Sequence, residues 1–153
     1  MTAMMKWPLL AAAAIVVLRV ALERAGAPEV VNNVFGVAWL YFLVPVYFAM
    51  QLLKSGNPKP YGALVKNTAI YAALTRLMVI PTYWLAYANQ WTQARFSAEQ
   101  GGVVGDGITP LQGYLIIPVR NALFWVVFAT ILGGLIGGVY LAIRLRKTAK
   151  SAA

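Results

Sequence analysis

The sequence contains no cysteine and no histidine in its 153 residues. Without cysteine there can be no disulfide, no thiol nucleophile and no Cys-ligated iron–sulfur cluster. Without histidine the chain lacks the side chain that most often ligates zinc or haem iron and that acts as a general base near neutral pH. We therefore expect neither a metal site nor a bound cofactor.

Charged residues are also scarce, at 11% of the chain, whereas 61% of the residues are hydrophobic. This balance excludes a disordered chain and argues strongly against a soluble globular domain. Only 4 residues are acidic against 13 that are basic, which gives a net charge of +9. Because the basic residues border apolar segments, we expect anionic membrane lipids as partners and no nucleic acid.

The apolar segments predict an all-α integral membrane protein with a bundle of four transmembrane helices in a single domain, residues 1–153. A spanning helix needs roughly 20 apolar residues, and the last three of the four segments reach that length. The predicted spans are residues 7–22, 34–53, 62–88 and 114–143. Residues 89–113 contain several glycines and predict an irregular outer loop.

The first segment is the weakest of the four because Arg19 ends its uninterrupted apolar run. A cleaved signal peptide over residues 1–27 is the alternative, since Lys6 would be its basic start and residues 25–27 resemble a cleavage site. Pro28 would then follow the cut directly, which is unusual. We favour a retained helix.

The basic residues are distributed unequally between the two sides of the predicted bundle. One side carries Lys6, Lys54, Lys59, Lys66, Arg144, Arg146, Lys147 and Lys150. The other side carries only Arg24 and Arg95. Because loops rich in Lys and Arg stay in the cytoplasm, both termini are predicted to be cytoplasmic. The composition is compatible with a bacterial inner (plasma) membrane, which is the predicted location.

Arg76 is the most unusual residue of the spans because it is predicted near the middle of the membrane. It lies about 21 Å along a helix from Gly62, and insertion scales give a cost of about 2.5–3.5 kcal/mol for an arginine there. Tyr83 and Tyr87 lie on the same helical face and offer hydroxyl groups. Two interpretations stay open: a site for an anion or polar ligand, and an arginine whose hydrogen bonds hold the bundle together.

Two further arginines lie toward the outer ends of spans. Arg19 precedes Glu23 by one helical turn, which predicts an ion pair that neutralises charge locally. Arg120 lies near the start of the last span with Asn121 beside it, and we expect it to point into a contact between helices. Three arginines would then face a single carboxylate, so a lipid, a ligand or a partner subunit should supply negative charge.

The last span also contains a glycine cluster that predicts close helix packing. Its members form two pairs with the spacing typical of helix contacts in membranes, Gly133 with Gly137 and Gly134 with Gly138. The pattern does not decide whether these glycines pack within the chain or against another one. Other membrane subunits or a homo-oligomer are the expected protein partners.

The leading functional hypothesis is a small non-enzymatic subunit, or an assembly or stabilising factor, of a larger membrane complex. The absence of histidine, cysteine and mid-membrane carboxylates favours it, because proton relays and most catalytic dyads use such groups. The alternative is a transporter or binding protein for an anionic or amphipathic ligand, such as a lipid, quinone or carboxylate, with ligand contacts at Arg19, Glu23, Arg76, Tyr83, Tyr87, Arg120 and Asn121. An enzyme is the least favoured class.

Overall fold

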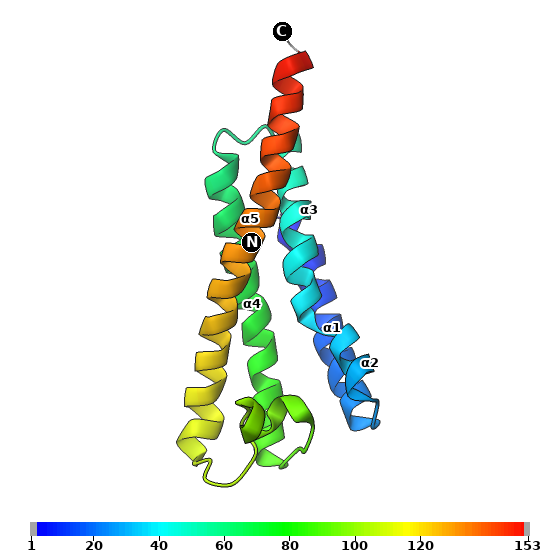
Figure 1. Cartoon of the computed structure of the whole chain (residues 1–153), viewed down its shortest axis with the longest axis vertical. Coiled ribbons are helices and arrows are strands. Elements are labelled where there is room, and N and C mark those ends of the chain that lie inside the picture. The colour runs from blue at the N-terminus through cyan, green and yellow to red at the C-terminus, as the bar shows by residue number, and fades with distance from the viewer. Residues whose placement is uncertain (1–2, 152–153) are drawn as a thin grey trace.

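The computed structural model describes residues 3–151, and every regular element in this range is a helix. The principal helices are α1 (Lys6–Arg24), α2 (Glu29–Val34), α3 (Leu40–Lys54), α4 (Pro60–Ala88) and α5 (Ile117–Ser151). A π-helical turn, Gln112–Ile116, leads directly into α5. Figure 1 shows α4 and α5 side by side, with α3 and α1 beside them and the C-terminal end of α5 extending beyond the other helices.

Three segments are long and apolar enough to cross a membrane: Glu29–Lys54, Pro60–Ala88 and Gln112–Thr148. The chain is therefore a helical membrane protein. Helix α1 is not among these segments, because its 19 residues include Lys6, Arg19, Glu23 and Arg24. A crossing by α1 stays a prediction, as does the side on which each terminus lies.

The predicted span 34–53 is not one continuous helix. Helix α2 ends at Val34, Gly36 is extended with ψ of 142°, and α3 begins only at Leu40 after a 3₁₀ turn at Val37–Trp39. A Cβ atom on Gly36 would lie 3.0 Å from Nη1 of Arg19. The backbone at the break therefore passes close to the Arg19 guanidinium. A side chain larger than that of glycine at position 36 would obstruct this close approach.

Glycines on one face of α5 allow close contact with α3 and α4. A Cβ atom on Gly133 would lie 2.6 Å from Cγ of Pro45 and 2.7 Å from Cγ2 of Thr68. One on Gly137 would lie 2.9 Å from the carbonyl oxygen of Pro45. By contrast, a Cβ on Gly138 meets no atom within 4 Å, so the two glycine pairs have different surroundings.

Aromatic residues fill the centre of the bundle, where α1, α3 and α4 meet. The rings of Tyr41 and Phe48 each pack edge-to-face against the ring of Tyr71 on α4. The Tyr71 hydroxyl also donates a hydrogen bond to the carbonyl oxygen of Pro8 at 3.4 Å. This contact places the first turn of α1 level with the middle of α4, so α1 packs against the half of α4 that leads to the 89–113 loop.

The 89–113 loop folds back onto α4 as a compact cap. It contains two short 3₁₀ turns, Ala94–Phe96 and Ala98–Gln100, and an isolated bridge between Ser97 and Val104. The side chains of Phe96 and Val103 are completely buried, and the Phe96 ring packs edge-to-face against Tyr83. This docking fixes the position of the residues next to Phe96.

Candidate functional site: a cationic cavity between the helices

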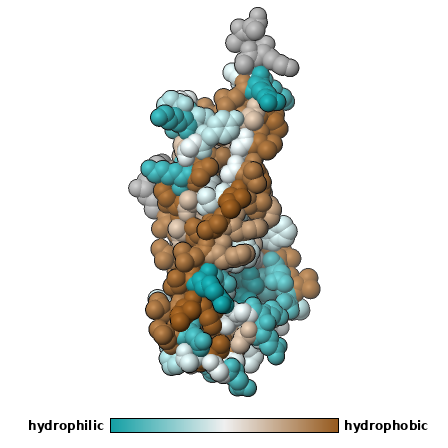
Figure 2. Space-filling view, turned by 60° about the vertical axis from the view of Figure 1, so that its left-hand side comes forward, coloured by the Kyte–Doolittle hydropathy of each residue, from teal (hydrophilic) through white to brown (hydrophobic). Residues whose placement is uncertain are grey.

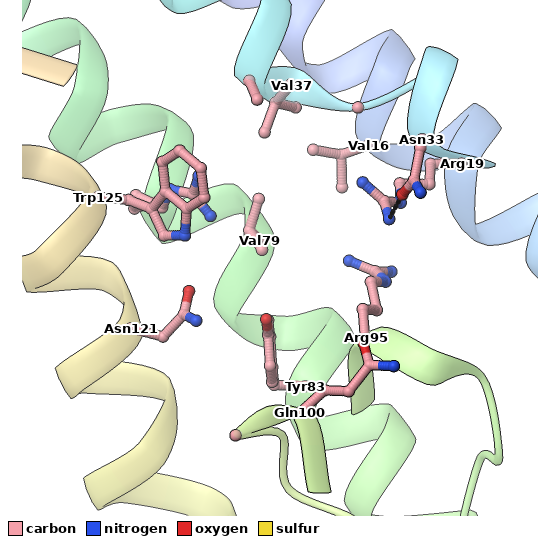
Figure 3. A pocket seen from close by; sticks show the side chains of 14 residues that line it. Val16, Arg19, Asn33, Val37, Val79, Tyr83, Arg95, Gln100, Asn121 and Trp125 are labelled. Atoms are coloured by element: carbon pink, nitrogen blue, oxygen red, sulfur yellow. Dashed lines mark hydrogen bonds between the residues drawn. The ribbon is translucent and has the colours of Figure 1, made fainter. Parts of the chain in front are cut away.

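A cavity of about 380 Å³ lies among α1, α4, α5, the segment that joins α2 to α3, and the cap. Its polar lining consists of Arg19, Asn33, Arg76, Arg95, Gln100 and Asn121, together with the hydroxyl-bearing ring of Tyr83. Its apolar wall includes Val16, Val37, Val79 and Trp125. In Figure 3 Arg19 and Arg95 face one another on one side, and Tyr83, Asn121 and Trp125 project from the other. The size is typical of a site for a small organic ligand.

Arg76 reaches this cavity from the middle of α4. Its side chain is held by aromatic groups: Nε donates to the Tyr41 hydroxyl at 3.0 Å, and the guanidinium carbon lies 4.7 Å from the centroid of the Trp125 ring. Cation–π contact of this kind stabilises a desolvated guanidinium. Within residues 4–148, Arg76 forms no ion pair, although it is only 7% exposed. Its charge is therefore not neutralised by a carboxylate of those residues.

Glu23 lies beside the cavity, outside its lining, and both of its carboxylate oxygens accept hydrogen bonds from arginines of the lining. Nε of Arg19 donates to Oε1 at 2.9 Å, as the helical spacing predicted, and Nη2 of Arg95 donates to Oε2 at 2.8 Å. Glu23 is 4% exposed, so it is a buried anion shared by two cations. Arg19 also reaches Oδ1 of Asn33 at 3.5 Å.

Arg95 is the charged residue of the lining that was not selected from the sequence; Asn33, Gln100 and Trp125 were not selected either. It lies in the first 3₁₀ turn of the cap, and the buried Phe96 ring beside it fixes that turn against α4. Its guanidinium stacks 4.1 Å from the centroid of the Phe96 ring. Burial lowers the pKa of Arg95, and the charge of Glu23 acts in the opposite direction. The one available signal was an arginine adjacent to an aromatic residue in a glycine-rich loop.

Three predicted ligand residues, Glu23, Tyr87 and Arg120, do not line the cavity. The Tyr87 hydroxyl donates to the carbonyl oxygen of Ile108 at 3.2 Å, and its ring packs on Gly113, so Tyr87 anchors the cap. Arg120 is exposed, and our expectation that it points into a contact between helices is wrong. The reason is that Arg120 shares a face of α5 with Gly138, which meets nothing, rather than with Gly137, which packs on α3 and α4.

Positive charges outnumber negative charges at the site, as expected from the sequence. The third arginine is Arg95 and not the expected Arg120. Three guanidinium groups, those of Arg19, Arg76 and Arg95, line the cavity, and none of the described lining residues carries a carboxylate. Glu23, outside the lining, pairs with two of the three. Among the residues that the structure describes there is no cluster of three or more His, Cys, Asp or Glu side chains. The lining can therefore attract and hold an anion, and it would repel a metal cation.

Comparison with known proteins supplies no relative, since no protein-family model, no curated protein and no solved structure matches the chain.

Proposed function

We propose that the protein binds an amphipathic anion in the cavity formed by Arg19, Arg76 and Arg95. The observation that carries this proposal concerns Arg76. Its guanidinium is buried, borders the cavity and forms no ion pair within residues 4–148. The Tyr41 hydroxyl and the Trp125 ring stabilise this guanidinium but do not neutralise its charge. A buried charge without a counterion is costly, and a bound anion would lower that cost. Arginine also matches the geometry of carboxylate and phosphate groups through paired N–H donors.

The position of the cavity favours a ligand with an apolar part. Arg76 is about 24 Å along α4 from Pro60 and about 18 Å from Ala88, at 1.5 Å per residue. A hydrocarbon layer of about 30 Å centred near Arg76 would therefore enclose its part of the cavity. Figure 2 agrees with such a layer, since a mainly hydrophobic belt separates hydrophilic groups at the two ends of the molecule. The valines and Trp125 of the wall suit a hydrocarbon chain or ring.

The same layer supports four crossings with both termini in the cytoplasm. Tyr71 lies about 16 Å along α4 from Pro60, and its contact with Pro8 places the start of α1 near this level. Lys6, two residues before Pro8, is then within roughly one helical turn of the level of Lys66. Lys6 can extend its ammonium group to the interface from there. At the opposite end, Arg24 stacks 4.9 Å from the ring centroid of Trp91 in the cap, a pairing typical of the membrane interface. The excess of basic residues near the other ends of the helices supports a cytoplasmic position for those ends, and a bacterial inner membrane stays a prediction.

A subunit or assembly factor remains the competing function, and the geometry favours it less. Helix α5 exposes large apolar side chains, including Leu123, Phe124, Val127 and Ile131. Lipid covers such a face as readily as another protein does, so it does not indicate a partner. The open surface at Gly138 would suit a second copy of the chain, and a homo-oligomer through the glycines of α5 stays a prediction.

To distinguish the two functions, the complex is extracted from its native membrane in a mild detergent and its intact mass is measured. The proposal predicts one small anionic amphipath retained at one molecule per chain after delipidation. A complex that contains other polypeptides and no such molecule would favour the subunit function. A bare chain that also fails to take up anionic lipids added back in excess would overturn the binding proposal.

A further inference from the structure

A second cavity, of about 260 Å³, adjoins the first and shares Arg19, Asn33, Arg95 and Gln100 with it. Most of its lining residues are polar or charged, and Ala27 and Ala94 are the apolar members within the described residues. Four of its lining residues carry carboxamides, since Asn32 and Gln93 join the two that it shares with the first cavity, and the carboxylates of Glu23 and Glu29 line it as well. These groups can accept hydrogen bonds from a hydroxyl group. A ligand that is anchored among the arginines can therefore extend a polar group into this space.

Three buried polar atoms at the second cavity have no hydrogen-bond partner within the described residues. Nδ2 of Asn32 donates to the carbonyl oxygen of Ala27 at 3.0 Å, which leaves Oδ1 of a side chain only 7% exposed without a donor. Nε2 of Gln93 donates to the carbonyl oxygen of Glu23 at 3.2 Å, which leaves Oε1 in the same state. Nε of Arg95 is a donor without an acceptor. Buried groups of this kind are rare in native proteins and usually find a partner.

These atoms define the chemistry that would satisfy them. Two are acceptors and one is a donor, so the missing group must both donate and accept hydrogen bonds. A hydroxyl group does both, whereas an ammonium group only donates and a further anion only accepts. The terminal torsions of Asn32 and Gln93 are broad, so a small rotation of each carboxamide turns its oxygen toward the cavity.

We infer that the ligand carries hydroxyl groups next to its anion, as a phosphoglycerol or sugar phosphate does, with the anion among the arginines and the hydroxyls in the second cavity. This inference rests on the proposed anion-binding function. It names the headgroup class, which can belong to a membrane lipid or to a soluble phosphate ester. Asn32 and Gln93 are then the residues that select the headgroup, whereas Arg76 binds any anion of suitable shape.

The test compares lipids that share their acyl chains and differ only in the headgroup, by titrating the purified full chain in detergent. Phosphatidylglycerol and phosphatidylpropanol carry the same single negative charge, and only the first has headgroup hydroxyls. We expect phosphatidylglycerol to bind about threefold to tenfold more tightly, which corresponds to one net hydrogen bond. The Asn32→Ala variant should lose this preference, and Asn89→Ala, an exposed asparagine outside both cavities, should keep it.

Each result has one meaning. Equal binding of the two lipids by the unaltered protein would overturn the hydroxyl inference while leaving the anion site intact, and this result does not depend on whether the Asn32 variant folds. Tighter binding of phosphatidylethanolamine would overturn it in favour of an ammonium group. Binding of none of these lipids would overturn the anion site itself, unless soluble glycerol 1-phosphate binds. Competition by glycerol 1-phosphate supports the inference with a soluble ligand, and its failure to compete supports it with a lipid.

Discussion

Nη2 of Arg95 donates a hydrogen bond to Oε2 of Glu23 at 2.8 Å, although 72 residues separate them in the sequence. This bond joins the cap to the end of α1, and it closes one side of the cationic cavity. The same carboxylate accepts from Arg19, so Glu23 holds two of the three arginines in place.

We predict that Glu23→Gln destabilises the protein by about 1–3 kcal/mol. Removing the anion of a buried ion pair leaves its cations unpaired, at a cost of about 3–5 kcal/mol when both are fully buried. The effect is smaller here because the side chains of Arg19 and Arg95 keep about a fifth of their exposure. Thermal unfolding in detergent measures the change, with the exposed Glu99→Gln as the matched control. Equal stability of the two variants would contradict a structural role for the shared carboxylate.

The second prediction concerns the stability effect of a larger side chain at Gly137 on α5, and Gly138 is the control position. A Cβ atom at position 137 would lie 2.8 Å from Cδ2 of Leu64 and 2.9 Å from the carbonyl oxygen of Pro45, whereas a Cβ at position 138 meets no atom within 4 Å. We expect Gly137→Leu to cost about 1–3 kcal/mol of unfolding free energy, and Gly138→Leu to cost less than about 0.5 kcal/mol. Denaturant titration compares them, and the reverse order would show that the wrong face has been assigned to the interior.

Ligand binding is predicted to be nearly independent of pH. The chain has no histidine, and arginine stays protonated because its ordinary pKa is above about 12. Burial lowers the pKa of Arg95 and so disfavours its charged form in the folded state. Stability would therefore rise as the pH passes that pKa. The affinity for a phosphodiester lipid should change less than about twofold from about pH 6 to pH 9. A tenfold fall near neutral pH would show that another group binds the anion.

The absence of cysteine makes the topology directly testable, since each single-cysteine variant carries one thiol. With four crossings, Glu99→Cys should react with a membrane-impermeant maleimide on intact cells. Lys6→Cys, Ser55→Cys and Lys147→Cys should react only after the cells are permeabilised. Labelling of Lys6→Cys on intact cells, with the other two protected, would show that α1 does not cross the membrane.

The sequence predicted the parts of the site that depend on one helix. The spacing of Arg19 and Glu23 fixes their pairing once α1 forms, and the depth of Arg76 follows from its place in a long apolar segment. The apolar lengths predicted four spans, and three helices of the structure are long and apolar enough to cross a membrane. These features depend on local geometry and hydrophobicity, which a sequence displays directly.

The remaining parts depend on contacts between distant segments. Arg95 enters the cavity because Phe96 docks on Tyr83, and nothing near Arg95 in the sequence indicates that the cap folds back. The two glycine pairs of α5 are equivalent in sequence, and only the packing of Pro45 and Thr68 turns Gly133 inward. Arg120 was predicted to face another helix because it shares a face with Gly138, and the sequence does not show that this face lies outside the packed interior.

The most direct test of the account is the affinity of the purified protein for an anionic phospholipid before and after the change Arg76→Gln. Arg144→Gln is the matched control, because Arg144 is exposed on α5 and lines neither cavity. Loss of a charged hydrogen-bonding partner should weaken binding by about 1.5–3 kcal/mol, which is roughly tenfold to more than a hundredfold, while the control keeps its affinity. Equal affinity of the Arg76 variant and the control, with both folded, would contradict the claim that the cavity at Arg76 is an anion site.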